Sequence, residues 1–234
     1  MSMEVNKWKE IWSKRLIESD YTDLLSELIR LDGFDGKTGK IELDSWNKYI
    51  SFICEKIDVR KDDTIFEIGC GSGAFLYPFY REGYKVEGVD YSPVLVDAAK
   101  KLWNAPVVCC EADQIPVYPQ FDVVVSNSVF FYFPDLDYAR RVIERMIQKA
   151  KRVIAILELP NKDVMDASEN MRKKLVGENV YEIKYKNLKH LYYSKDWLKK
   201  IGDKFNLETE IFDQNIEGYN SNDYRFNCIY LKKR

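Results

Sequence analysis

Three glycines at alternate positions, Gly69, Gly71 and Gly73, directly follow an apolar run over residues 64–68. The β-branched and aromatic residues of that run predict a buried strand, and a helix is expected to open at Ser72. Glycine reaches positive φ and has no Cβ, so such a turn can bring bare backbone close to a ligand. Strand, glycine turn and helix in this order favour a nucleotide-binding site over a plain turn.

A second candidate group is the carboxylate of Asp90, which ends a predicted strand over residues 84–90. It follows the glycines by about 20 residues, the spacing at which a carboxylate accepts hydrogen bonds from both hydroxyls of a ribose. Ser92 and Pro93 supply the cap and first residue of the next predicted helix, which leaves Asp90 available to a ligand. Gly69, Gly71 and Ala74 also fit the looser dinucleotide-binding fingerprint. The glycines alone therefore do not exclude NAD as the cofactor.

The glycine turn resembles motif I of the class I S-adenosylmethionine-dependent methyltransferases, an acidic and an apolar residue followed by Gly-x-Gly-x-Gly. Glu67, Gly69, Gly71 and Gly73 fall on this pattern without a gap. The resemblance implies that the turn, with Cys70 inside it, cradles the methionine part of the cofactor and that Glu67 lies close beneath.

A segment after the third predicted strand, residues 106–110, resembles the family sequence Gly-Asp-Ala-x-x-Leu-Pro when aligned on Ala112. Glu111 stands where the family has aspartate, and the resemblance implies that it binds the adenine amino group with help from the Ala112 amide. Asp113 is the alternative for this role. Acids after two successive strands fit a methyltransferase better than a dehydrogenase.

The loop after the fourth predicted strand is expected to face the reacting groups, because ligands of open α/β sheets bind beyond the carboxyl ends of the strands. Phe131 and Tyr132 stand there, where many family members have histidine, and the Asn/Asp-Pro-Pro-Tyr signature of amino-methylating enzymes is missing. The expected cofactor-binding residues are Glu67, Gly69, Cys70, Gly71, Gly73, Asp90, Tyr91, Glu111, Ala112, Asp113, Asn127 and Ser128.

Methyl transfer from a sulfonium is an in-line displacement that requires alignment more than acid–base groups. A hydroxyl or ammonium acceptor would need a base, and the sole histidine, His190, is the natural candidate together with Tyr192; a surface position beside the basic stretch 184–189 is the alternative. If the acceptor is already anionic, Arg225 or a lysine of that stretch should matter instead. The first case is slightly favoured. The candidate substrate residues are Tyr21, Trp46, Phe131, Tyr132, Tyr193 and Arg225.

The resemblance implies a Rossmann-like α/β fold, with a seven-stranded, mostly parallel sheet, helices on both faces and an antiparallel last strand. Residues 61–234 are expected to form this domain, with a helical insertion at about 161–193. Residues 1–60 predict a helical lid made of three amphipathic helices, at about 6–17, 21–31 and 44–57.

Composition limits the classes of partner and compartment. Lys and Arg (36) nearly balance Asp and Glu (38), and the missing basic excess argues against a dedicated nucleic-acid binder. Five cysteines without a Cys-x-x-Cys pair, and one histidine, argue against structural zinc and disulfides and fit a reducing cytosol. The polar N-terminus and short apolar runs predict neither a signal peptide nor a membrane span, so a cytoplasmic location is expected.

These observations predict an S-adenosylmethionine-dependent methyltransferase that acts on a small metabolite or biosynthetic intermediate, with S-adenosylhomocysteine as product and no metal. The acceptor atom is oxygen or nitrogen, in a molecule that could bear sugar or phosphate. The alternatives are methylation of RNA or protein, a non-catalytic cofactor-binding domain, and an NAD-dependent oxidoreductase.

Overall fold

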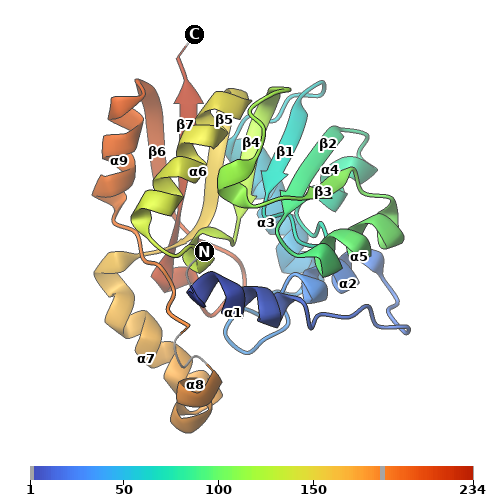
Figure 1. The fold of residues 1–234 in the computed structure, drawn as a ribbon, viewed down its shortest axis with the longest axis vertical. Helices are drawn as coiled ribbons and strands as arrows, with labels where there is room; N and C mark the ends of the chain where they lie inside the picture. Colours follow the sequence, from blue (N-terminus) through green and yellow to red (C-terminus); the bar gives the residue numbers. More distant parts are fainter. Residues whose placement is uncertain (1–2, 185–187, 234) are drawn as a thin grey trace.

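The computed structural model describes residues 3–184 and 188–233. Within them, seven strands form one sheet in the order β3-β2-β1-β4-β5-β7-β6 (Figure 1). β1 to β5 run parallel, and β7 lies antiparallel between β5 and β6. This confirms the predicted Rossmann-like sheet and its antiparallel last strand. The strands are β1 (Thr64–Ile68), β2 (Lys85–Asp90), β3 (Val107–Cys109), β4 (Phe121–Asn127), β5 (Ala150–Pro160), β6 (Leu207–Asp213) and β7 (Arg225–Lys232).

Helices cover both faces of the sheet because its central strands are apolar on both sides. Successive side chains of a strand point to opposite faces. In β4, Val123 and Val125 join the core beneath α3, α4 and α5, whereas Val124 joins the core beneath α6 and α9. Burial on both faces is typical of a parallel strand. These helices are α3 (Leu43–Lys56), α4 (Leu76–Arg81), α5 (Pro93–Trp103), α6 (Leu136–Lys149) and α9 (Lys195–Lys204).

The helix start predicted at Ser92 is confirmed by its cap hydrogen bond, and α6 and α9 begin with the same kind of cap. Ser92 accepts a bond from the Leu95 amide at the start of α5, with Pro93 as the first helical residue. Asp135 caps α6 and Ser194 caps α9 in the same way. Each cap satisfies one of the amides that a helix N-terminus leaves without an intrahelical partner.

The helix after the glycine turn begins later than predicted, at Leu76 instead of Ser72. Gly71 and Gly73 have φ values of 54° and 100°, which are incompatible with a right-handed helix. The turn therefore continues for three residues beyond Ser72.

The N-terminal segment forms three helices, α1 (Met3–Trp12), α2 (Leu24–Leu31) and α3. α1 ends five residues before the predicted end at 17, and Asp44 lies in the first turn of α3 instead of capping it. The N-cap residue, Glu42, makes no side-chain cap bond. Figure 1 shows α1 running across the carboxyl ends of the parallel strands.

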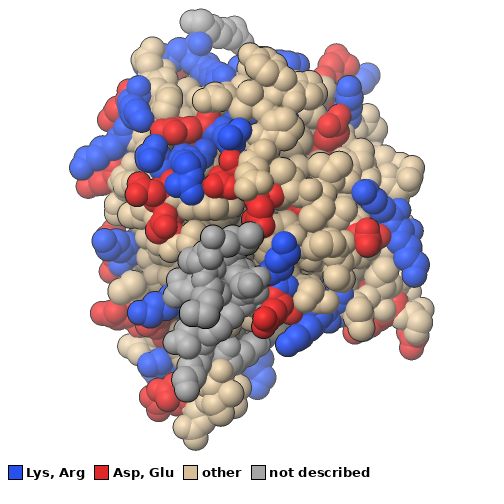
Figure 2. Space-filling model, in the orientation of Figure 1, with Lys and Arg blue, Asp and Glu red and all other residues tan. Residues whose placement is uncertain are grey.

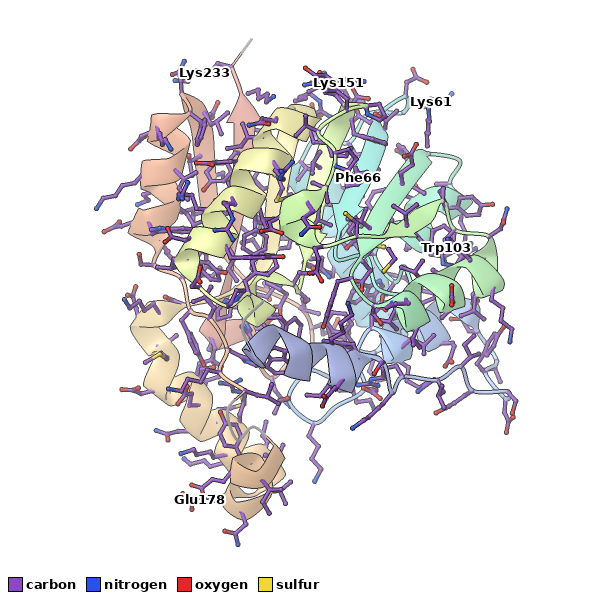
Figure 3. All side chains as sticks on the ribbon, in the orientation of Figure 1. Lys61, Phe66, Trp103, Lys151, Glu178 and Lys233 are labelled. Atoms are coloured by element: carbon purple, nitrogen blue, oxygen red, sulfur yellow. The ribbon has the colours of Figure 1, made fainter. Side chains whose placement is uncertain are left out.

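Two helices lie within the range predicted for the insertion, α7 (Met165–Val176) and α8 (Glu178–Lys184), and they project away from the sheet (Figure 1). In Figure 3, Glu178 marks the tip of this projection, and Lys61 and Lys151 mark the opposite end of the molecule. Residues 185–187 of the basic stretch lie outside the described residues. In the described part of the chain, no helix has the length and apolar character required to span a bilayer.

The third glycine of the turn makes room for a tryptophan. Trp103, at the end of α5 (Figure 3), donates a hydrogen bond from Nε1 to the carbonyl of Ser72, at 2.9 Å. A Cβ built on Gly73 would overlap the Trp103 ring. Gly73 is therefore required for packing as well as for its positive φ.

We expect Gly73→Ala to lower the free energy of unfolding by about 2–5 kcal/mol, the sum of left-handed strain and overpacking. Gly83→Ala is the matched control for strain alone, because Gly83 has φ +87° and open space around its Cβ position; about 1–2 kcal/mol is expected. Gly36→Ala should change little, since its Cβ position is open and its φ is not restricted. Urea unfolding measures all three, and equal losses for Gly73→Ala and Gly83→Ala would contradict the packing role.

Candidate active site

Three adjoining cavities lie at the carboxyl ends of the parallel strands. The first surrounds the glycine turn, the second lies against Tyr91 and Glu111, and the third extends toward α7 and β7. Tyr132 lines all three, and Ser128 lines the first and the third. The cavities are therefore joined at the loop after β4, the place that the sequence predicts for the reacting groups.

Asp90 is held rigidly at the edge of the first cavity. Its two carboxylate oxygens accept hydrogen bonds from the amides of Gly71 (2.9 Å) and Ser92 (2.8 Å), and the residue is 5% exposed. Burial raises the pKa of Asp90 to about 6, against the opposing effect of the two amides. Since each carboxylate oxygen can accept a second bond, Asp90 retains capacity for a ligand.

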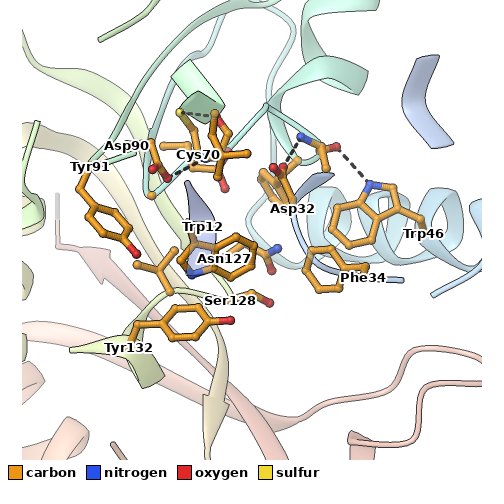
Figure 4. A pocket seen from close by; sticks show the side chains of 17 residues that line it. Trp12, Asp32, Phe34, Trp46, Cys70, Asp90, Tyr91, Asn127, Ser128 and Tyr132 are labelled. Atoms are coloured by element: carbon orange, nitrogen blue, oxygen red, sulfur yellow. Dashed lines mark hydrogen bonds between the residues drawn. The ribbon is translucent and has the colours of Figure 1, made fainter. Parts of the chain in front are cut away.

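Asp32 is a site residue that the sequence analysis did not find. It follows α2, and its carboxylate accepts hydrogen bonds from the amides of Ser72 (2.6 Å) and Ala74 (2.9 Å). A Cβ on Gly71 would overlap this carboxylate, so the second glycine admits an acid onto the turn. Burial raises the pKa of Asp32 to about 7. Figure 4 shows Asp32 across the cavity from Asp90.

Buried polar atoms that lack partners indicate that the first cavity is built for a polar ligand. Glu67 is 2% exposed, and its Oε2 has no hydrogen-bond partner among the described residues; the same holds for the Tyr91 hydroxyl and for Oγ of Ser128. Burial, and then the nearby Asp32 and Asp90, raise the pKa of Glu67 well above its usual value. Buried polar groups are normally hydrogen-bonded, so these atoms are candidate ligand contacts.

The residues present fit S-adenosylmethionine. The first cavity provides bare glycine backbone and carboxylates for the amino acid and the ribose. The second cavity has aromatic walls for a base and includes Glu111 and Ala112. Asp113 is instead paired with Arg141 at 3.3 Å and lies outside this lining. Of the two acids considered for adenine, Glu111 is the one on the cavity.

The third cavity encloses about 930 Å³, part of it open to solvent, and its polar wall is rich in arginine. Arg172 comes from α7 and Arg225 from the start of β7. Trp8 and Trp12 of α1 form the opposite wall and contact Tyr132, with ring centroids 4.6 Å and 5.5 Å away. The N-terminal helix therefore encloses this cavity.

His190 lines the third cavity, but its geometry argues against the expected role as a base. Its Nδ1 is hydrogen-bonded to Nη1 of Arg172. A guanidinium only donates, so Nδ1 accepts and the ring proton is on Nε2. Burial, together with Arg172 and Arg225, lowers the pKa of His190 well below its usual value. The neutral ring stacks on Trp8 with centroids 5.4 Å apart.

Four of the other predicted catalytic or substrate residues do not line the third cavity. The Tyr192 hydroxyl accepts a bond from Arg172 at 2.8 Å, and the fully buried Tyr193 donates to the Phe130 carbonyl at 2.8 Å. Both hydroxyls are therefore hydrogen-bonded to other residues of the fold. Tyr21 is 41% exposed and lies outside the three linings, and Trp46 borders the first cavity.

The remaining predicted residues separate by cavity. Gly73 lies outside the lining of the first cavity because it packs on Trp103. Asn127 lines the first cavity, and its Oδ1 accepts a bond from the Tyr49 hydroxyl at 2.9 Å. Phe131, Tyr132 and Arg225 line the third cavity as expected. Eight of the predicted cofactor-binding residues line the first cavity: Glu67, Gly69, Cys70, Gly71, Asp90, Tyr91, Asn127 and Ser128.

Residues 66–155 match the family model of a methyltransferase domain. The chain is also 29% identical over 119 residues to "Probable ribosomal RNA small subunit methyltransferase A" of Methanosphaera stadtmanae, a match that covers 45% of this chain and 44% of that protein. The chain thus spans less than half of that relative's length.

Solved structures resemble the whole chain. Magnesium protoporphyrin IX methyltransferase from Synechocystis PCC 6803 with bound S-adenosylmethionine has a TM-score of 0.63 at 12% identity, covering 100% of this chain and 99% of that one. The plantazolicin methyltransferase BpumL with S-adenosylhomocysteine has a TM-score of 0.64 at 16% identity and full coverage of both chains. At these identities the likeness concerns the fold. Residues 66–155 therefore match a methyltransferase domain, and the whole chain has the fold of the class I S-adenosylmethionine-dependent methyltransferases.

Proposed function

We propose that the protein transfers a methyl group from S-adenosylmethionine to a small metabolite or biosynthetic intermediate. The observation that carries the proposal is the junction of the first and third cavities at Trp12, Ser128 and Tyr132. A cofactor in the first cavity and an acceptor in the third would meet at this junction. Alignment of two bound reactants contributes roughly 7–11 kcal/mol in well-oriented systems.

The charge of the first cavity supports S-adenosylmethionine over NAD. Asp32, Glu67 and Asp90 place three carboxyl groups around one glycine turn, and those of Glu67 and Asp90 are buried. The methionine ammonium and the sulfonium are cationic and would be attracted to these groups, whereas the pyrophosphate of NAD would be repelled. In the bound state S-adenosylmethionine supplies an electrophilic methyl group, with a neutral thioether as leaving group.

Each part of the first two cavities has a defined role in this proposal. Asp90 binds the ribose hydroxyls, and Asp32 lies beside the glycine turn as the counter-ion of the methionine ammonium. Glu111 and the Ala112 amide contact the adenine, against the Tyr91 ring. These residues orient the cofactor with its methyl group toward Tyr132 and the third cavity.

The N-terminal segment, residues 1–60, acts as a lid in this proposal, with residues 61–234 as the catalytic domain. Trp8 and Trp12 exclude water where they pack on Tyr132. The segment is also tied to the C-terminal hairpin, because the Ser221 hydroxyl donates to the Thr38 carbonyl at 2.9 Å. An acceptor cavity closed by a lid favours a small substrate over a macromolecule.

Methylation of RNA is the second candidate, and the ribosomal RNA relative favours it. A contiguous basic surface would support that activity. On the face shown in Figure 2, basic and acidic side chains are interspersed instead. The third cavity, which α1 borders and which is only partly open to solvent, adds to the case for a small acceptor. All five cysteines are free, which supports a reducing compartment such as the cytoplasm.

S-adenosylhomocysteine at a hundred times its dissociation constant should stabilise the protein by about 2.7 kcal/mol, and NAD should not. Asp90→Ala should weaken binding of S-adenosylhomocysteine by roughly ten- to a hundredfold, because charge-assisted bonds to the ribose are lost. Thermal shift and calorimetry measure these effects, with the exposed Asp62→Ala as control. A response to NAD alone would overturn the cofactor assignment, and unchanged affinity of a folded Asp90→Ala variant would remove Asp90 from the site.

The affinity for S-adenosylhomocysteine should rise with pH between 6 and 7.5. With its pKa raised to about 7, Asp32 is largely protonated at pH 6 and must ionise to attract the ligand's ammonium. The rise should approach tenfold per pH unit well below that pKa, because one proton is released on binding. Asp32→Asn should bind more weakly and with a flatter profile from pH 6.5 to 7.5. Calorimetry tests this, and a variant profile parallel to the wild type would contradict the role of Asp32.

A further inference from the structure

We propose that the third cavity binds an oxyanion of the methyl acceptor, a carboxylate or a phosphate, through the guanidinium of Arg225, with Arg172 as a second cation on the same wall. This inference rests on the proposed function and specifies its substrate class. It is carried by the hydrogen-bonding state of Arg225, by the charges around the cavity and by the tautomer of His190.

Arg225 is a buried cation whose donors are not all used. It is 7% exposed, and its Nε and Nη1 have no hydrogen-bond partner among the described residues. Glu158 lies nearby, but its Oε2 is 3.8 Å from Nε of Arg225, beyond hydrogen-bond distance. A buried cation with unsatisfied donors is costly unless a ligand supplies the acceptors.

Glu158 is held away from Arg225 by other groups. Its carboxylate accepts hydrogen bonds from the Tyr219 hydroxyl (2.6 Å) and from Nε2 of Gln214 (2.9 Å). Its backbone has φ +66°, where the pairing of β5 with β7 shifts register. Glu158 therefore supplies a fixed negative charge without satisfying the guanidinium donors.

The orientation of Arg225 is set by an aromatic ring. The Cζ atom of Arg225 lies 4.6 Å from the centroid of the Phe131 ring. This cation–π contact covers the guanidinium from one side. Because the hydrogen-bond donors of a guanidinium point outward in its own plane, they remain accessible to an oxyanion in the cavity.

The charges that line the third cavity leave a positive excess on this wall. Arg172 is hydrogen-bonded to two neutral groups, the His190 ring and the Tyr192 hydroxyl, and its Nε has no hydrogen-bond partner among the described residues. Arg15 is paired with Asp35 at 2.7 Å. Two guanidinium groups thus face the single carboxylate of Glu158, and Asp32 lies at the junction with the cofactor cavity.

An anionic acceptor also explains how the site can work without His190 as base. Methylation of a carboxylate or phosphate oxygen forms one O–C bond and breaks one S–C bond. The negative charge of the oxyanion and the positive charge of the sulfonium are both removed, so no proton has to move. If a group beside the oxyanion is methylated instead, Arg225 would bind the oxyanion in the same way.

The test uses the full chain saturated with S-adenosylhomocysteine, at constant ionic strength. The probes are phenylacetate with phenylacetamide, and phenyl phosphate with phenol, each pair differing in charge. Calorimetry and thermal shift should show at least tenfold tighter binding of one or both anions than of their neutral partners. Preference for the carboxylate or for the phosphate identifies the oxyanion class. Equal binding of anions and neutral partners would overturn the proposal.

Arg225→Gln should weaken binding of the preferred anion at least tenfold and leave binding of its neutral partner within about twofold, since one charge-assisted bond contributes about 1.5–3 kcal/mol. Arg225→Lys should retain part of the preference for the anion over its neutral partner. This variant provides the test if Arg225→Gln does not fold. Arg81→Gln, at the exposed end of α4, is the matched control and should match the wild type. Undiminished anion binding by folded Arg225→Gln would contradict the inference.

Unchanged binding of S-adenosylhomocysteine in the Arg225 variants separates the two proposals. If the wild type binds S-adenosylhomocysteine but does not discriminate the anions, only the acceptor inference fails. If the wild type does not bind S-adenosylhomocysteine, the proposed function itself fails.

Discussion

The structure depends on the hydrogen bonds that two carboxylates, the buried Asp90 and the half-buried Asp32, make to the backbone around the glycine turn. Asp90 accepts hydrogen bonds from the amides of Gly71 and Ser92, and Asp32 accepts hydrogen bonds from those of Ser72 and Ala74. A turn with positive φ at its glycines has amides that neither a helix nor a strand can use. The acids satisfy these amides and fix the turn against β2 and α2, but the arrangement concentrates negative charge in a buried space.

The first and third cavities, which adjoin at Tyr132, carry opposite charges. The first cavity holds acids whose pKa values rise because of burial, and a cationic cofactor would relieve this cost. The third cavity holds Arg172 and Arg225, for which an anion would have the same effect. A cationic methyl donor and an anionic acceptor would then be drawn to opposite sides of Tyr132, so that electrostatics would contribute to alignment as well as to affinity.

Sequence analysis predicted the parts that depend on local patterns. The alternating glycines, the acid at the end of β2 and the cap at Ser92 each have a signature over a few residues, and the family resemblance implied the seven-stranded, mostly parallel sheet. Asp32 had no such signature, because its role arises only when α2 packs against a turn 40 residues away. The bond between Arg172 and His190 likewise joins an inserted helix to a later segment, so the histidine alone suggested a base that the geometry does not support.

Most of the residues that line the third cavity, the proposed acceptor site, come from outside the segment that matches the family model; Ser128, Phe131 and Tyr132 lie inside it. Trp8, Trp12 and Asp32 precede residues 66–155, while Arg172, His190 and Arg225 follow them. The matched segment holds most of the cofactor cavity, whose chemistry is the same for every acceptor. In the proposed function, substrate choice would therefore depend on the N-terminal helices, the α7–α8 segment and the last strand. These additions lie together at the carboxyl ends of the parallel strands because a parallel sheet presents all of those ends at one edge (Figure 1). An acceptor site can thus change in charge and shape while the glycine turn and Asp90 keep the methyl donor in place.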